Sequence, residues 1–189
     1  MNILNEPNHS PYAIKRKGMA PASLGAAAML LAGLAPSAIA ATATSTLTVS
    51  ATVARTCTIS TTTQLAFGTY DPVGANASTD LNGTGQINVA CTKGTNSPMI
   101  GMDLGQNASG SSRRMTSGTD YLVYEIYQPD SAGTGCPYTT VWGNTGPAQY
   151  DPGTVNKTGK NITVCGKVPA NQDVAAGNYT DTVVATINF

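Results

Sequence analysis

Few residues of this sequence could take part in acid–base, nucleophilic or metal chemistry. The only histidine, His9, lies near the N-terminus, so the rest of the chain cannot form histidine-based catalytic triads or most metal hydrolase sites. Glu125 is the only glutamate after Glu6. It alternates outward on a predicted strand, where Asp103 or Asp120 could partner it in a two-carboxylate site. Solvated strand faces explain these three carboxylates better, and we expect neither enzyme activity nor a cofactor.

The four cysteines are the other reactive side chains, and all of them follow residue 40: Cys57, Cys91, Cys136 and Cys165. An even number in an exported chain indicates disulfides. Four cysteines allow three pairings, and we favour Cys57–Cys91 with Cys136–Cys165 because each pair links predicted strands that are near in sequence. A zinc site is the weaker alternative, since no pair has the close spacing of a zinc knuckle and no histidine is available.

The N-terminal segment has the features of a secretory signal peptide. A basic cluster at Lys15–Lys17 precedes an apolar run over 20–35 and a small-x-small site at 38–40, which predicts cleavage after Ala40. A membrane anchor is the alternative. The run is shorter than the roughly 20 residues that a spanning helix needs, and proline and glycine interrupt it.

Cleavage leaves residues 41–189, enough for one domain with a substantial core. Without Glu6 and Lys15–Lys17, the ten basic and ten acidic residues fall to seven and nine. This balance provides no basic patch for nucleic acid.

The elements that must position these residues are strands. The segment Thr44–Cys57 alternates, and one face carries Leu47, Val49, Ala51 and Val53. A period of two indicates a strand with one buried face. Because no local partner precedes it, that face must meet a distant segment or another chain.

The same alternation predicts later strands at 57–60, 65–70, 86–91, 100–104, 121–127, 139–142, 161–168 and 178–189, whereas 73–85 reads as a loop. Eight or nine strands, with turns about every ten residues, favour an all-β sandwich. Trp142 is interpreted as a core or rim aromatic rather than a sugar platform. Arg113 and Arg114 are interpreted as part of a solvated loop rather than a ligand site.

A set of short motifs spans the chain after residue 40. In order they are Thr56–Ile59, Leu65–Tyr70, Gly85–Cys91, Leu122–Tyr127, Thr140–Gly143, Gly166–Gln172 and Ala176–Val183. With these motifs the chain resembles the spore coat protein U domain family, found in subunits of archaic chaperone–usher pili. The pair Cys136 and Cys165 is not expected in every member and reads as an added staple.

The resemblance implies an incomplete immunoglobulin-like sandwich that lacks its last strand and is completed by donor-strand exchange. A periplasmic chaperone would fill the resulting groove first, and the leader of a neighbouring subunit would then replace it. On this reading 1–40 is the signal peptide, 41–56 the donor extension and 57–189 the pilin domain. The donor residues are Leu47, Val49, Ala51 and Val53, and the acceptor groove is lined by Val183, Ala185, Ile187 and Phe189.

The function implied is a structural subunit of a surface pilus, with a role in adhesion or biofilm formation. Its partners would be the chaperone, an outer-membrane usher and neighbouring subunits, and it would pass through the periplasm to the cell surface. One alternative is a secreted spore-coat or matrix protein whose own leader fills its sandwich. Another is a carbohydrate-binding tip module that uses Trp142.

Overall fold

The computed structural model describes residues 40–189. The predicted signal peptide therefore lies outside the described residues, apart from Ala40. Within the described range, no helix has the length and apolar character needed to cross a membrane. The chain divides into two units, 1–48 and 49–189. Residues 40–48 contain no helix or strand, and every strand belongs to the second unit.

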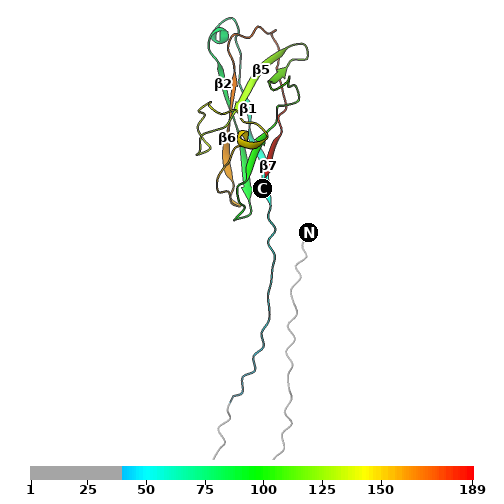
Figure 1. The fold of residues 1–189 in the computed structure, drawn as a ribbon, viewed down its shortest axis with the longest axis vertical. Helices are drawn as coiled ribbons and strands as arrows, with labels where there is room; N and C mark the ends of the chain where they lie inside the picture. The colour runs from blue at the N-terminus through cyan, green and yellow to red at the C-terminus, as the bar shows by residue number, and fades with distance from the viewer. Residues whose placement is uncertain (1–39) are drawn as a thin grey trace, which may run out of the picture. The chain divides into compact units, whose positions relative to one another are not determined.

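The second unit is built from two sheets (Figure 1). The larger sheet has the order β1-β2-β6-β5-β4, and the smaller sheet pairs β3 with β7. All pairings are antiparallel. The strands are β1 (Cys57–Ala66), β2 (Leu81–Cys91), β3 (Met99–Met102), β4 (Arg113–Thr116), β5 (Tyr121–Tyr127), β6 (Lys160–Val168) and β7 (Ala185–Asn188). Two short 3₁₀ turns, η1 (Ala75–Ala77) and η2 (Gly146–Ala148), are the helical elements of the described part.

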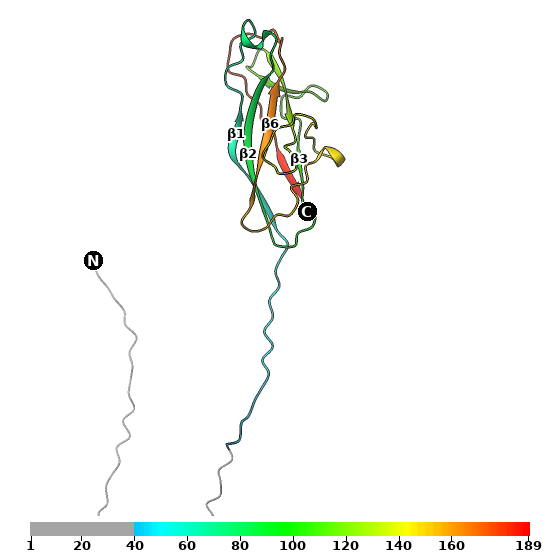
Figure 2. The same cartoon turned by 90° about the vertical axis from the view of Figure 1, so that its left-hand side faces the viewer.

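The larger sheet is centred on β2 and β6, whose register runs from Leu81 opposite Val168 to Val89 opposite Lys160. Along both strands the apolar side chains alternate and point to one face, where Val89 and Ile162 are fully buried. In Figure 2 this layer, with β1, β2 and β6, is seen beside β3 of the smaller sheet. The prediction of an all-β fold built from two antiparallel sheets is confirmed.

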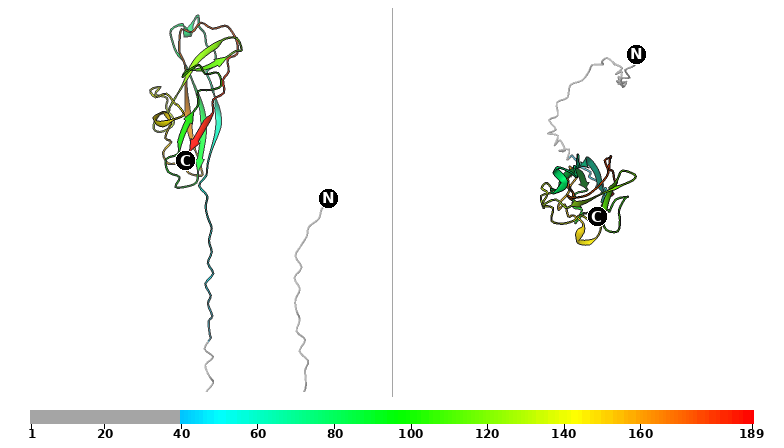
Figure 3. Two further views of the ribbon diagram at one scale, coloured as in Figure 1. Left: turned by 45° about the vertical axis from the view of Figure 1, so that its right-hand side comes forward. Right: turned by 90° about the horizontal axis from the view of Figure 1, so that it is seen from above.

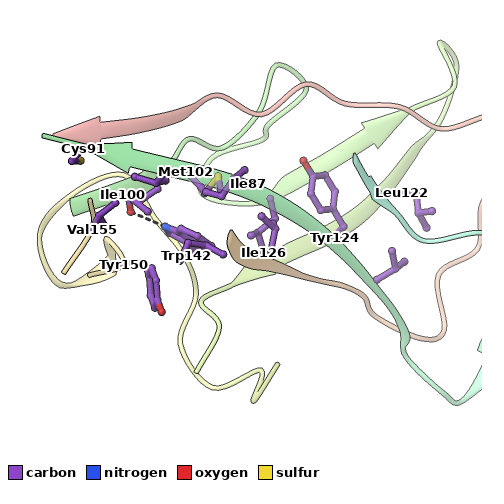
Figure 4. Close-up of a cluster of buried hydrophobic side chains, with 14 residues drawn as sticks. Ile87, Cys91, Ile100, Met102, Leu122, Tyr124, Ile126, Trp142, Tyr150 and Val155 are labelled. Atoms are coloured by element: carbon purple, nitrogen blue, oxygen red, sulfur yellow. Dashed lines mark hydrogen bonds between the residues drawn. The ribbon is translucent and has the colours of Figure 1, made fainter. Parts of the chain in front are cut away.

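Trp142 lies at the centre of the core between the sheets. Its side chain is completely buried, and its indole Nε1 donates a hydrogen bond of 2.7 Å to the carbonyl oxygen of Ile100 (Figure 4). The ring of Tyr150 lies 5.4 Å from the tryptophan ring, centroid to centroid. The buried indole satisfies its only polar group inside the protein. Trp142 is therefore a core residue, and a surface sugar platform built on it is excluded.

Both favoured disulfides are formed. Cys57–Cys91 joins the first residue of β1 to the last residue of β2, and Cys136–Cys165 joins a loop to β6. Among the described residues no cysteine is free. The first bridge fastens an edge strand to its only partner in the sheet.

The strands differ from the sequence prediction in several places. The two strands expected at 57–60 and 65–70 form one strand, β1, which ends at Ala66. Residues 81–85, predicted as a loop, belong to β2. A single bridge, Tyr127 to Val141, replaces the strand expected at 139–142. Of the long strand expected at 178–189, only β7 forms, preceded by a bridge from Thr180 to Thr116. The described part therefore contains seven strands rather than eight or nine, and 44–53 is not in a strand.

There is a physical reason why the sequence pattern does not reveal residues 81–85 as part of β2. Gly83 and Gly85 occupy its inward positions, where an apolar side chain would normally show the alternation. A Cβ at Gly85 would lie 2.8 Å from the backbone nitrogen of Leu65, so β1 approaches β2 too closely for any side chain there. Glycine in a strand interior marks such close approaches.

Candidate functional site

An apolar groove opens between β1 and the segment that leads into β7. Its central part has a volume of about 240 Å³. Apolar side chains from both sheets form the floor and walls, among them Leu65, Phe67, Ile87, Met102, Val164 and Val183. Polar groups occur along the rim, including Thr61, Gln64 and Thr180. A groove with this pattern suits an amphipathic segment better than a small polar substrate.

A second hollow, of about 830 Å³, continues the groove away from β7. The two hollows share Leu65, Phe67, Met115, Tyr179 and Thr180, so they are one continuous feature. Along the β1 side the lining extends from Thr61 to Tyr70 and on to Val73. This wall follows β1 from Thr61 to Ala66, which spans about 17 Å at about 3.3 Å per residue, and then continues through the loop to Tyr70.

Both walls of the groove offer backbone hydrogen-bonding groups. Because the amide of Asp103 donates to the carbonyl oxygen of Val184 at 3.1 Å, the backbone groups of Val184 face β3. Since the backbone N–H and C=O groups of successive residues in a strand point to opposite edges, the backbone groups of Val183, Ala185 and Ile187 point away from β3 and toward the groove. On the opposite wall, β1 is the edge strand of its sheet. The left view of Figure 3 shows β1 in cyan and β7 in red along the two walls. An extended chain could pair with either edge.

One polar pair, Tyr124 and Asp181, lies inside the groove, and its side chains are hydrogen-bonded within the protein. The Tyr124 hydroxyl donates to Oδ2 of Asp181 at 2.7 Å. The other oxygen, Oδ1, accepts from the amides of Gln106 and Asn107, at 3.0 and 3.1 Å, and from the Asn107 side chain. Burial, and then the neighbouring carboxylate, raise the pKa of Tyr124 far above its ordinary value. The phenol stays protonated, and this pair stabilises the groove wall rather than transferring protons.

Arg113 corrects the expectation of a solvated loop. Its side chain is completely buried and forms an ion pair with Glu125. The guanidinium also donates to the carbonyl oxygens of Met102, Asp103 and Trp142, at 3.1, 2.6 and 2.7 Å respectively. Glu125 is accordingly half-buried, not outward and solvated. A buried guanidinium whose three nitrogens are all hydrogen-bonded is a structural element of the core.

The predicted acceptor residues take different positions. Val183 and Ala185 line the groove. Ile187 is half-buried and packs on the core below it, and Phe189 is 50% exposed and does not belong to the lining. The prediction did not include the β1 wall, which Leu65 and Phe67 provide. Their alternation in the motif Leu65–Tyr70 was the available signal, but that motif was interpreted only as a separate strand.

The predicted donor residues are exposed. Leu47, Val49 and Val53 are 87%, 85% and 80% exposed, and Ala51 is exposed as well. Residues 49–56 contain no helix or strand. Their apolar face is thus unpartnered in the chain as it stands, at a cost that burial against another surface would remove.

These features define an all-β sandwich protein with an open groove and an unpartnered apolar leader. The chain belongs to the Spore Coat Protein U domain family, whose model matches residues 43–186. This confirms the resemblance drawn from the motifs.

Two known proteins are similar to the chain. Protein U of Myxococcus xanthus is 38% identical over an alignment of 142 residues, and the alignment covers 66% of this chain and 71% of that protein. A solved structure, the CsuC–CsuE chaperone–tip adhesion subunit pre-assembly complex from the archaic chaperone–usher Csu pili of Acinetobacter baumannii, matches with 24% identity and a TM-score of 0.44. The match covers 73% of this chain and 40% of that one.

Proposed function

We propose that this protein is a structural subunit of a surface pilus, assembled when the leader of one copy fills the groove of another. The observation behind the proposal is that one chain carries both halves of the contact. It has an apolar groove with open strand edges and an exposed alternating leader. Neither half is satisfied within the described chain, and pairing between copies satisfies both.

The dimensions of the leader suit the groove. From Thr44 to Val53 the leader has ten residues, which extend over about 33 Å at 3.3 Å per residue. That length is enough to cover the β1 part of the wall and to continue along the loop that follows it. Burying Leu47, Val49 and Val53 contributes up to about 3 kcal/mol each. Backbone pairing to Val183 and Ala185 adds directional hydrogen bonds and fixes the register.

An open apolar groove with free strand edges favours aggregation before assembly. We therefore propose that a periplasmic chaperone lends a strand to the groove and that an outer-membrane usher supports the exchange for the leader. Residues 1–40 would direct export and be removed, and the assembled fibre would lie at the cell surface. A role of the fibre in adhesion or biofilm formation follows from the family resemblance. The proposed function is structural and requires no cofactor.

The decisive experiment is deletion of 44–53 in cells that express the chaperone and usher. The truncated subunit should accumulate bound to the chaperone and form no fibres. Val49→Asn should weaken assembly because it places an amide in the apolar groove, whereas Thr48→Asn, on the other face of the leader, is the matched control. Normal fibres from the deletion variant would contradict the proposal.

A coat or matrix protein with a self-filled sandwich is the competing function. It predicts a chaperone-free monomer that stays soluble, melts cooperatively and protects residues 44–53 from proteases. The exposed leader side chains argue against it.

A further inference from the structure

The charged side chains of the second unit are separated between the two ends of the sandwich. At the end of the groove formed by Pro72 and Val174, here called the far pole, four carboxylates gather: Asp71, Asp80, Asp120 and Asp173. Hydrogen bonds tie the loops of this pole together. Asp80 accepts from the amide of Ala170 at 3.0 Å, and Asp120 accepts from that of Ala175 at 2.9 Å.

Two carboxyls of the far pole are stabilised in their charged form by backbone amides. Backbone hydrogen bonds, from Ala170 to Asp80 and from Ala175 to Asp120, hold the pKa of each carboxyl below its usual value. Two cations lie nearby. Lys167 pairs with Asp80 at 3.4 Å, and Arg114 stacks on the ring of Tyr121 at 4.0 Å. Four carboxylates against two cations leave this pole negative.

The opposite end, here called the leader pole, is where β1 begins and β2 ends. Four cations gather there: Arg55, Lys93, Lys157 and Lys160. Strand pairing places these four cations at one end of the sandwich. Cys91 lies opposite Cys57, the amide of Cys91 donates a hydrogen bond to the carbonyl oxygen of Asn156, and Lys160 lies opposite Val89. Asp151 and Asp130, near Tyr150, and the C-terminal carboxylate of Phe189, beside Asn188 of β7, are the anions in this half, so four cations outnumber three anions. The leader pole is therefore positive.

The base of the leader is fastened to this positive pole. The hydroxyl of Thr92 donates to the carbonyl oxygen of Ala54 at 3.0 Å and accepts from the amide of Thr56 at 3.1 Å. The amide of Thr92 also donates to the carbonyl oxygen of Thr56 at 2.8 Å. Only residues 54–56 thus separate a donor segment ending at Val53 from the body of its own subunit. Three residues reach about 10 Å.

We propose, on the basis of the function proposed above, that the positive leader pole of one copy docks on the negative far pole of the preceding copy. The partner is a second copy of this chain, and the contact sets the direction of the inserted leader. With Val53 at the far end of the groove, the short linker brings Arg55, Lys93 and Lys157 against the four carboxylates. Insertion in the reverse direction would place two leader poles together, cation against cation.

An exposed apolar residue at the far pole fits this contact. Val73 is 91% exposed and borders the end of the groove. Docking of the next subunit would cover it. Charge complementarity between the poles would also steer the encounter of subunits, which makes assembly sensitive to salt.

Three residues are suited to a charge-swap test because they are exposed and their charged groups form none of the hydrogen bonds or ion pairs of the described residues: Asp173, Lys93 and Lys157. The assay uses complexes of the mature chain with its chaperone and follows the rate of fibre formation at low and high sodium chloride. Asp173→Lys alone, or Lys93→Glu with Lys157→Glu, should each slow assembly about tenfold at low salt. Ser111→Lys, in the exposed loop before β4, is the matched control.

Combining all three changes makes the far pole neutral, with three carboxylates and three cations, while the leader pole is negative. The triple variant should therefore assemble faster than the Lys93→Glu/Lys157→Glu variant, in which two negative poles face each other. Wild-type assembly should slow as salt increases. Unchanged rates in the single-pole variants, or a triple variant as slow as the Lys93→Glu/Lys157→Glu variant, would overturn pole docking while leaving strand exchange intact. Failure of the wild-type chain to polymerise, with the same result after deletion of 44–53, would instead overturn the proposed function and the docking with it.

Discussion

The hydroxyl of Tyr124 donates a 2.7 Å hydrogen bond to Oδ2 of Asp181. It connects β5, in the larger sheet, to the segment that precedes β7. Since Asp181 also accepts from the amides of Gln106 and Asn107, one carboxylate holds three parts of the chain together. The groove wall at Val183 is thus fixed by a polar contact rather than by a continuous strand ladder.

Replacing Tyr124 by phenylalanine should lower the free energy of unfolding by about 1–2 kcal/mol. The change removes one hydrogen bond to a charged group and keeps the ring. Urea denaturation measures the effect, with Tyr121→Phe at an exposed position as the control. Equal stability of the two variants would show that the Tyr124–Asp181 bond contributes nothing measurable.

Alkaline pH should destabilise the wild-type protein more than the Tyr124→Phe variant. Burial and the Asp181 carboxylate raise the pKa of Tyr124 above its ordinary value of 10.0, so the folded state favours the neutral phenol. This contribution is fully present below pH 10 and is lost as the pH rises above it, because the unfolded chain then releases the proton more readily. Melting temperatures between about pH 9 and pH 12 test the difference.

Removing Arg113 should destabilise the core by about 3–5 kcal/mol, because Glu125 and three carbonyl oxygens would lose a buried partner. Arg113→Met is the appropriate variant, since methionine keeps the volume of the stem. The matched control, Arg114→Ala, removes a stack on Tyr121 and one hydrogen bond to the carbonyl oxygen of Asn107, and should cost about 1–2 kcal/mol. Adding Glu125→Leu to Arg113→Met should restore part of the loss. Similar denaturation midpoints for Arg113→Met and Arg114→Ala would contradict this role.

Reduction of the disulfides should lower stability in two separable steps. Each bridge closes a loop of moderate length, with sequence separations of 34 and 29, which corresponds to about 3–4 kcal/mol in the chain-entropy model. Cys57→Ser with Cys91→Ser should also speed amide exchange along β1, whereas the Cys136/Cys165 double variant should leave β1 protected. Hydrogen exchange distinguishes the two double variants. Identical exchange of the β1 amides in both would contradict the view that the Cys57–Cys91 bridge holds β1 on the sheet.

The sequence pattern predicted the fold best where side chains alternate strongly. Leu122, Tyr124 and Ile126 were expected on one face of a strand and are all buried on β5. The pattern failed where glycine replaces the inward side chains, as at Gly83 in β2. The pattern failed also at Arg113. Two adjacent arginines usually indicate a solvated segment, and nothing local in the sequence shows that other segments supply Glu125 and three carbonyl oxygens as partners for one of them.

The groove was predicted from one side only. Val183 and Ala185 lie on the wall whose alternation was recognised, whereas Leu65 and Phe67 lie on β1. The register of β1 against β2 shifts between Thr61 and Thr63 and again between Thr63 and Ala66. Such irregularities bend a strand away from its partner. No local pattern in the sequence encodes where that bend directs the side chains.

The Cys57–Cys91 bridge also has a mechanical meaning. An edge strand held only by hydrogen bonds can be peeled off one bond at a time when its end is pulled. Tension applied to the leader reaches Cys57 and passes directly into β2, which lies inside the sheet between β1 and β6. Because of the covalent link, the force must shear the β1–β2 and β2–β6 pairings together instead of breaking the β1–β2 hydrogen bonds one at a time. A subunit pulled by its leader should therefore resist extension far better when oxidised than when reduced.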